Sequence, residues 1–248
     1  MNTPDPVRHG TAPEPMALLD ASRIRAITID LDDTLWPIWP TIERAEAALS
    51  AWLAEHAPAT ARRWGNPAAL REVRNQMHHT RPDLAHDLSG LRRESIRLVL
   101  TQSGDDPALA EPAFEIFFAE RQRVELFEDA LPALEWLAAR YPVVALSNGN
   151  ADVHRVGLGR HFQAALSARE FGVGKPDARI FHAAAQAAGA GAAEVLHIGD
   201  DAQLDVVGAL GAGMQVAWLN RAGHTWDHAP LQPHATVSDL LALCRQIG

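Results

Sequence analysis

A single strand-like segment near the start of the chain is separated from all the others by a long helical stretch. Residues 25–30, RAITID, form a short apolar run that ends in an acid, which predicts a buried strand. In residues 41–124 the apolar residues recur at helical spacing, and no strand-like segment interrupts them. After them, strand-like and helix-like segments alternate, which predicts a parallel sheet covered on both faces. Four further strands are expected, at residues 142–148, 162–168, 194–201 and 215–220.

This pattern predicts an α/β fold: a Rossmann-like parallel sheet core with an inserted all-helical cap domain. Residues 21–36 and 126–248 form the predicted core, and residues 37–125 form the cap. We expect four helices in the cap, one of which begins with Asn66 as its N-cap. Residues 1–20 contain prolines and lack a hydrophobic segment, so we expect a disordered N-terminal tail rather than a signal peptide.

Composition argues against some classes of partner. The net charge of -9 at pH 7 argues against a non-specific nucleic-acid binder and against binding to an anionic membrane. Cys244 is the only cysteine, so no internal disulfide can form, which fits a reducing compartment and predicts a cytoplasmic protein. No apolar run approaches the roughly 18 residues of a membrane helix. We therefore expect a small-molecule ligand, no nucleic acid, no membrane, and a monomer or weak homodimer.

Polar residues gather where three of the predicted strands end. They are DLDDT at residues 30–34, SNGN at 147–150 and GDDAQLD at 199–205, and Lys175 lies in a loop before a helix. Ligands bind at the carboxyl ends of strands in open α/β sheets, so we expect these clusters to meet at one edge. Carboxylates at two strand ends predict a hard oxygen site suited to Mg²⁺, and the hydroxyl, amide and lysine can donate to a phosphate. Together they predict phosphoryl transfer.

Lys175 is the only lysine in a chain that has 22 lysine and arginine residues. A compact ammonium can contact a carboxylate and a phosphoryl group at once, where the larger planar guanidinium of arginine does not fit. We therefore interpret Lys175 as a functional residue; chance placement of the one lysine is the alternative.

The motifs resemble a known family. DLDDT, the SN that ends a strand, the isolated lysine before a proline and GDxxxxD occur in this order in the haloacid-dehalogenase superfamily of phosphohydrolases. The helical insert between the first two motifs resembles the C1-cap subgroup. The resemblance covers residues 24–220, and four motifs in order are far more specific than any one of them.

The roles expected from the residues agree with those that the resemblance implies. Asp30 is the expected nucleophile that forms an aspartyl-phosphate, and Asp32 protonates the leaving group and then assists water. The resemblance implies that the metal is held by Asp30, the backbone carbonyl of Asp32 and Asp200, and that Asp205 braces Lys175. The expected phosphate- and substrate-binding residues are Thr34, which orients the nucleophile loop, Ser147, the backbone N–H of Asn148, and Lys175.

A narrower resemblance concerns the segments SNGNADVHRVGLGRHF and EVLHIGDDAQLDVVGALGAGMQVAW. They are similar to bacterial phosphatases of this superfamily that act in riboflavin synthesis on a phosphorylated ribitylamino-uracil. A flat pyrimidine would suit stacking on Trp36 or Trp39, although packing of the hinge also explains these residues. In the cap, a few polar residues either face the substrate or form a solvated helix face: Arg81, His86, Asp87, Arg92 and Arg93.

Other functions stay open at this point. A sugar phosphomutase shares the core, and a non-catalytic ligand-binding protein is a third possibility. A dehalogenase has no use for Asp32, because halide leaves without a proton. A phosphonate hydrolase that forms a Schiff base needs a lysine in the cap, and the cap has none. The adjacent His78 and His79 are expected at the surface or in packing rather than as ligands.

Overall fold

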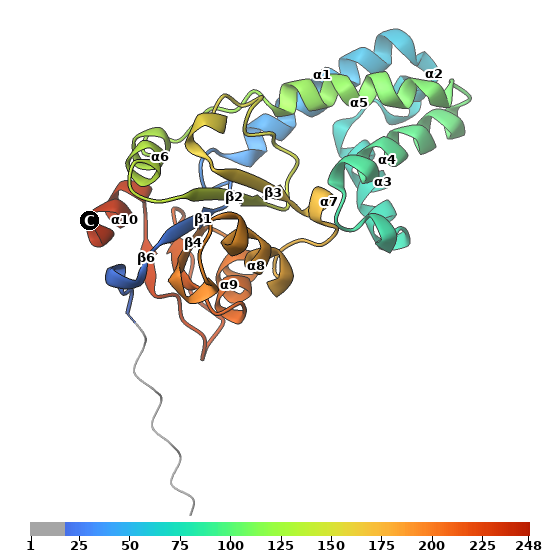
Figure 1. Ribbon diagram of the computed structural model, residues 1–248. Coiled ribbons are helices and arrows are strands. Elements are labelled where there is room, and N and C mark those ends of the chain that lie inside the picture. Colours follow the sequence, from blue (N-terminus) through green and yellow to red (C-terminus); the bar gives the residue numbers. More distant parts are fainter. Residues whose placement is uncertain (1–17) are drawn as a thin grey trace, which may run out of the picture.

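The computed structural model of the chain describes residues 18–248. A six-stranded parallel sheet forms its centre, in the order β3-β2-β1-β4-β5-β6 (Figure 1). The strands are β1 (Ala26–Ile29), β2 (Val143–Ser147), β3 (Ala164–Ser167), β4 (Val195–Gly199), β5 (Gln215–Leu219) and β6 (Ala235–Val237). β1 lies between β2 and β4, with Thr28 paired with Val144 on one side and His197 on the other. The strand ends with the acidic and SNGN motifs are therefore neighbours.

Helices cover both faces of the sheet. On one face, α6 (Ala130–Ala138) and α10 (Leu240–Ile247) pack with residues such as Ile27 and Ile29. On the other, α8 (Ala178–Ala187) and α9 (Gly208–Gly211) pack with residues such as Val144. The expected α/β fold is thus confirmed, with apolar strands buried on both faces. The remaining short elements of the core are α7 (Ala168–Phe171), the 3₁₀ turns η1 (Ala21–Arg23), η4 (Gly159–His161) and η5 (Ala192–Glu194), and the π-helical η6 (Ala202–Val207).

Between β1 and β2, five α-helices precede α6 and project from one end of the sheet (Figure 1). They are α1 (Ile38–His56), α2 (Pro58–Trp64), α3 (Pro67–Thr80), α4 (Leu88–Ser103) and α5 (Ala110–Arg121), with the 3₁₀ turns η2 (Pro82–Leu84) and η3 (Pro107–Leu109). They share an apolar cluster of their own that includes Leu49, Ile96 and Phe114. Asn66 caps α3 by accepting from the Ala68 N–H at 2.9 Å, as predicted.

Two segments connect the helical part to the core, and they touch each other. Leu35 and Trp36 of the first are fully buried, and the Leu35 carbonyl accepts from the N–H of Phe127 in the second, at 3.0 Å. Hinge packing therefore explains Trp36, and the alternative that Trp36 stacks on substrate is wrong. Trp39 is half exposed and lies under the guanidinium of Arg71, 4.7 Å from its ring centre.

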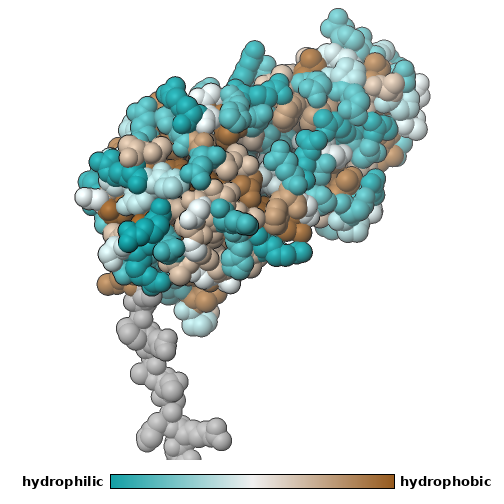
Figure 2. Space-filling model, viewed as in Figure 1, coloured by the Kyte–Doolittle hydropathy of each residue, from teal (hydrophilic) through white to brown (hydrophobic). Residues whose placement is uncertain are grey.

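The predicted disordered tail is too long, because residues 18–20 belong to the core. Residues 1–17 of the predicted tail lie outside the described residues. Residues 18–20 join the core, since the Leu19 N–H donates to the His234 carbonyl at 3.1 Å and the Asp20 N–H donates to Gln215 at 2.8 Å. On the face drawn in Figure 2, hydrophilic side chains alternate with smaller hydrophobic areas over both the core and the helical part. Across residues 18–248, no helix combines the length and apolar character needed to span a bilayer.

Candidate active site

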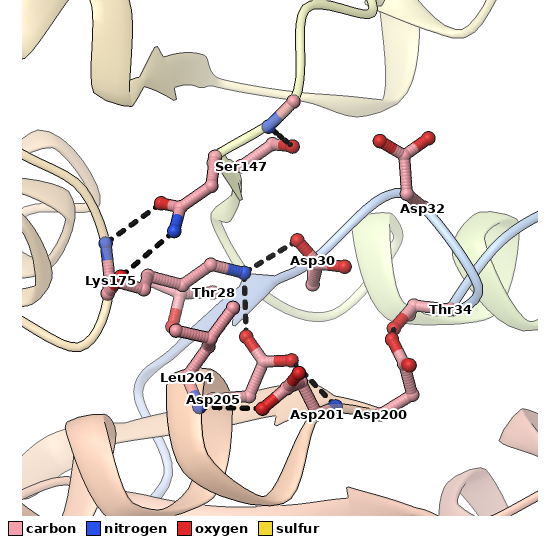
Figure 3. Close-up of polar contacts among 12 residues, drawn as sticks. Thr28, Asp30, Asp32, Thr34, Ser147, Lys175, Asp200, Asp201, Leu204 and Asp205 are labelled. Carbon is pink, nitrogen blue, oxygen red and sulfur yellow. Dashed lines mark hydrogen bonds and ion pairs between the residues drawn. The ribbon is translucent and has the colours of Figure 1, made fainter. Parts of the chain in front are cut away.

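Asp30 follows β1 directly and is anchored by its backbone, since its N–H donates to the Ile198 carbonyl at 2.9 Å. Its carboxylate accepts from Lys175 Nζ at 2.5 Å, and the same ammonium donates to Asp205 at 2.6 Å (Figure 3). All three side chains are buried. Burial raises the pKa of Asp30 well above its ordinary value, although the charge of Lys175 opposes the shift. The lone lysine of the chain thus joins two of the predicted site acids.

Both carboxylate oxygens of Asp205 accept hydrogen bonds. Its Oδ1 accepts from Lys175 and His197, and its Oδ2 accepts from the Asp201 N–H at 3.0 Å. Burial acts to raise the pKa of Asp205, but Lys175 and His197 outweigh it and hold that pKa well below the ordinary value. On the lysine, burial acts to lower the pKa, but Asp205 and Asp30 outweigh it and raise the pKa above its ordinary value. The geometry therefore suits Asp205 to bracing a charged Lys175.

His197 lies beneath this group and was not singled out from the sequence. It is fully buried in β4, with Nε2 at 3.1 Å from Asp205 and Nδ1 at 2.9 Å from Thr28 Oγ1. An ionised Asp205 can only accept, so we assign the proton to Nε2, and Nδ1 then accepts from Thr28. Burial lowers the pKa of His197, which fits the neutral ring. The one feature of the sequence that could have pointed to His197 is that it is a single polar residue within an otherwise apolar strand.

Asp200 and Thr34 meet on the other side of Asp30. Thr34 Oγ1 donates to Asp200 Oδ1 at 2.9 Å, and Trp218 Nε1 donates to the Asp200 backbone carbonyl at 2.7 Å. Burial raises the pKa of Asp200 to about 7, and the nearby charge of Asp205 adds to the shift. Asp201 instead caps the following turn, accepting from the N–H groups of Gln203 and Leu204.

Asp32 lies apart from the group around Lys175 (Figure 3). Its carboxylate accepts from Arg121 Nη2 at 2.6 and 2.7 Å and from Trp36 Nε1 at 2.8 Å. Arg121 is the last residue of α5, and 1 % of it is exposed. The sequence analysis missed Arg121, because the segment AERQRV carries no motif and does not tell which of its two arginines turns inward.

The loop after β2 brings the predicted phosphate ligands to the same edge. Ser147 Oγ accepts from the Gly149 N–H at 2.9 Å. The Asn148 side chain accepts from the Lys175 N–H at 2.7 Å and donates to the Lys175 carbonyl at 2.8 Å, so it fixes the lysine backbone. A Cβ on Gly149 would lie 2.4 Å from Asp32 Oδ2 and 3.1 Å from Ser147 Oγ. Asp32 and Ser147 therefore face each other across Gly149.

The acids also fit a divalent cation. One carboxylate oxygen from each of Asp30, Asp200 and Asp205 lies within 4.8 Å of the others. These are hard oxygen donors, and the raised pKa values of Asp30 and Asp200 reflect negative charge that is hard to hold there unaided. Because Asp205 is already occupied by three donors, Asp30 and Asp200 are the carboxylates best placed to bind the cation.

A cavity of about 250 Å³ lies beside Asp32, between the helical part and the β2 loop. Of the five polar cap residues named from the sequence, Arg92 lines it. His86 lines a second hollow that includes Lys175, whereas Asp87 caps α4. Arg81 pairs with Asp83, and Arg93 pairs with Glu111. His78 is exposed, as the sequence predicted for a surface residue, and it lines both hollows.

Comparisons with known proteins agree with this site. A family model described as a haloacid dehalogenase-like hydrolase matches residues 24–213. The chain is 34 % identical over 229 residues to the 5-amino-6-(5-phospho-D-ribitylamino)uracil phosphatase YigB of Escherichia coli, covering 89 % of this chain and 95 % of that one. It is 36 % identical over 155 residues to the phosphoserine phosphatase of Thermus thermophilus, covering 60 % and 62 %.

A solved structure, described as a 2-haloacid dehalogenase from Pseudomonas syringae, superposes with a TM-score of 0.82 at 38 % identity. The match covers 90 % of this chain and 98 % of that chain. The relatives named as phosphatases confirm the predicted enzyme class, a hydrolase of phosphoric monoesters. From its fold, its site and these matches together, the chain belongs to the haloacid dehalogenase-like hydrolase family.

Proposed function

We propose that the protein is a Mg²⁺-dependent phosphatase that hydrolyses a small phosphate monoester through an aspartyl-phosphate on Asp30. The observation that carries the proposal is the buried Lys175 ammonium, which contacts Asp30 at 2.5 Å and Asp205 at 2.6 Å. This contact holds a carboxylate at the end of β1 with one oxygen paired and the other available for attack on phosphorus. A positive charge beside it offsets the charge of the incoming phosphate.

In the first step, an Asp30 oxygen bonds to phosphorus while the bond from phosphorus to the ester oxygen breaks. Asp32 gives its proton to the leaving oxygen. In the second step, Asp32 takes a proton from water, the water oxygen bonds to phosphorus, and the bond to Asp30 breaks. Inorganic phosphate leaves and Asp30 is restored. The position of Asp32 across Gly149 from Ser147 supports this division of roles.

The loop after β2 would hold the phosphoryl oxygens. Ser147 Oγ and the backbone N–H of Asn148 donate to them, and Lys175 adds a charged donor. The Asn148 side chain makes two hydrogen bonds to the backbone of Lys175. These bonds hold the lysine in position next to the loop after β2 before substrate arrives. A divalent cation held by Asp30, Asp200 and the Asp32 carbonyl would supply further charge neutralisation when bound.

For the substrate, we propose 5-amino-6-(5-phospho-D-ribitylamino)uracil. The support is the match to the Escherichia coli phosphatase of that name, which runs over nearly the full length of both chains and so includes the helical cap. The match to the phosphoserine phosphatase covers a smaller part of each chain. The expected cytoplasmic location and monomeric or weakly dimeric state stay part of this proposal.

The dehalogenase structure at 38 % identity favours a second candidate, the hydrolysis of a 2-haloacid. Both reactions begin with attack by Asp30. They differ at Asp32, which the phosphatase needs as a proton donor and the dehalogenase does not. The Arg121 and Trp36 contacts that hold Asp32 in place support the phosphatase.

The test is release of inorganic phosphate or halide by the purified protein with Mg²⁺. The panel holds the ribitylamino-uracil phosphate, flavin mononucleotide, pyridoxal phosphate, sugar phosphates and 2-chloropropionate, with Asp30→Asn as the blank. We expect the highest kcat/KM for the ribitylamino-uracil compound and no halide release. Equal rates for all phosphate esters would contradict the substrate, and halide release without phosphate release would contradict the reaction.

A further inference from the structure

The 250 Å³ cavity beside Asp32 has a mixed lining. Ile42, Leu91 and Phe117 give it an apolar part, and Arg74, Arg92 and Arg121 bring guanidinium groups to it. A phosphate bound at Asp30 would present its ester oxygen to Asp32, so the rest of the substrate would extend into this cavity.

Positive charge exceeds negative charge around the cavity. Arg121 is paired with Asp32 at 2.6 Å, and Arg71 is paired with the buried Glu46 at 2.5 Å. Asp32 and Glu46 are therefore each already paired with one arginine. In the part of the chain that the structure describes, neither Arg74 nor Arg92 has a carboxylate partner of its own. Arg92 lies 3.8 Å from Glu46, which is already paired with Arg71.

Arg92 is held in a fixed position. It is 8 % exposed, and its guanidinium lies 3.6 Å from the ring centre of Phe117. Within residues 18–248 its guanidinium makes no hydrogen bond, apart from the longer ionic contact with Glu46. Burial lowers its pKa to about 9, and the charge of Arg74 adds to the shift. Burial of an incompletely paired charge is costly, so this arrangement is expected to persist where a ligand completes the pairing.

We propose that Arg74 and Arg92 select substrates whose leaving group carries a carboxylate or ring carbonyls. This inference rests on the proposed phosphatase function. A carboxylate can bind one guanidinium through two parallel N–H groups, and each ring carbonyl of a pyrimidinedione can accept an N–H from one of the two arginines. The hydroxyl groups of a polyol are uncharged and separate acceptors, so a polyol pairs less strongly with the two arginines. The apolar lining accommodates the carbon skeleton or ring, and Asn75 and His78, which also line the cavity, add polar groups.

Two substrate pairs separate this recognition from the chemistry. 5-Amino-6-(5-phospho-D-ribitylamino)uracil and D-ribitol 5-phosphate share the phosphate and the polyol, and only the first has ring carbonyls. Phosphoserine and phosphoethanolamine share the phosphate and the amine, and only the first has a carboxylate. In the unaltered enzyme, the member with the ring carbonyls or the carboxylate should have the higher kcat/KM in at least one pair.

The variants are Arg74→Met and Arg92→Met, which keep much of the side-chain volume. Arg93→Met is the matched control, because Arg93 is the next residue of α4 and also lies over a ring, that of Phe114 at 3.7 Å. Arg93 has its acidic partner in Glu111 at 3.0 Å and does not line the cavity. Circular dichroism and the rate on the polyol phosphate report whether each variant is folded.

We expect Arg74→Met and Arg92→Met to lower the preference within the favoured pair by roughly tenfold or more, the loss of one charge-assisted bond. The rate on the member without the carboxylate or ring carbonyls should change little, and Arg93→Met should leave the preference unchanged. A preference confined to phosphoserine would support the inference and overturn the proposed uracil substrate. Equal losses on both members of each pair, no loss at all, or an unaltered enzyme without any preference would overturn the inference. Absence of phosphate release from every ester would overturn the proposed function and the inference with it.

Discussion

Gly149 lies where no side chain fits. A Cβ at this position would be 2.4 Å from Asp32 Oδ2 and 3.5 Å from Arg121 Nη2. Gly149→Ala must therefore push the Asp32 carboxylate away from its place opposite Ser147. We expect kcat for an alkyl phosphate to fall roughly 10- to 100-fold, because proton transfer from a positioned acid contributes about that much or more. Overpacking should also lower the free energy of unfolding by about 1–3 kcal/mol.

Gly211→Ala is the matched control, since Gly211 ends the short helix α9 and a Cβ there meets nothing within 4 Å. We expect wild-type kcat and unchanged or slightly higher stability in urea unfolding, because alanine restricts the unfolded chain. If Gly149→Ala turned over alkyl phosphates as fast as Gly211→Ala, the placement of Asp32 would not matter for the reaction.

The acids of the site were predictable one by one, because each ends a strand-like run and the topology of such sheets brings those ends together. The partners of these acids were not. Arg121 reaches Asp32 from a residue 89 positions away, and no local pattern distinguishes it from the exposed Arg123. His197 differs from a packed strand residue only through its contacts with Thr28 and Asp205, which depend on the strand register.

Helix α5 ends in the arginine that holds Asp32, so an element of the cap contributes directly to the core chemistry. Arg121→Met removes that contact and leaves Trp36 as the remaining donor. We expect kcat for an alkyl phosphate, whose leaving group needs a proton, to fall roughly 10- to 100-fold. The rate on p-nitrophenyl phosphate, whose phenolate leaves readily without a proton, should fall much less.

Arg123→Met is the matched control for this element, because Arg123 pairs with Glu120 three residues earlier and is largely exposed. It should leave both rates unchanged. A loss of equal size on the two substrates in Arg121→Met would mean that Arg121 supports the fold or the cap rather than the position of Asp32. A parallel comparison of KM values separates these effects from weaker substrate binding.

Long periodic elements were predicted well and short ones were not. The five predicted strands appear, but β6 was missed, because three residues at the sheet edge carry too little pattern. The first predicted cap helix ends at His56, as α1 does, but the short helix α2 that begins at Pro58 was not predicted, so five helices replace the expected four. Proline lacks the N–H that a continuing helix needs but is well suited to the first position of a new one.

The crowding of acids makes the stability of the whole molecule depend on pH when divalent cations are removed. The pKa of Asp200 is about 7 in the folded state, against an ordinary value near 4 when unfolded. The proton therefore stabilises the folded state fully below about pH 4, and this contribution is lost as the pH rises through about 7. We expect the free energy of unfolding in a chelator to fall by about 2–4 kcal/mol over that range.

Urea unfolding between pH 4.5 and 8 with a chelator measures this slope, and Asp200→Asn should remove the part that Asp200 contributes. Asp30, whose pKa is also raised, adds to the slope in the same direction. Excess Mg²⁺ should restore stability at the higher pH, because it binds the ionised folded state in preference to the unfolded chain. A rise in stability with pH in the chelator, in both the wild-type protein and Asp200→Asn, would contradict the assignment of a raised pKa to Asp200.

The isolation of Lys175 also gives the protein an unusual chemical reporter. The chain has no other lysine, and this one is 5 % exposed, doubly ion-paired and held in its unreactive protonated form. An amine-selective reagent therefore finds no reactive lysine in the closed fold, and it can modify Lys175 only when the strand edge around Asp30 opens. The rate of that modification, followed by mass spectrometry, would time the opening of the site without any substrate.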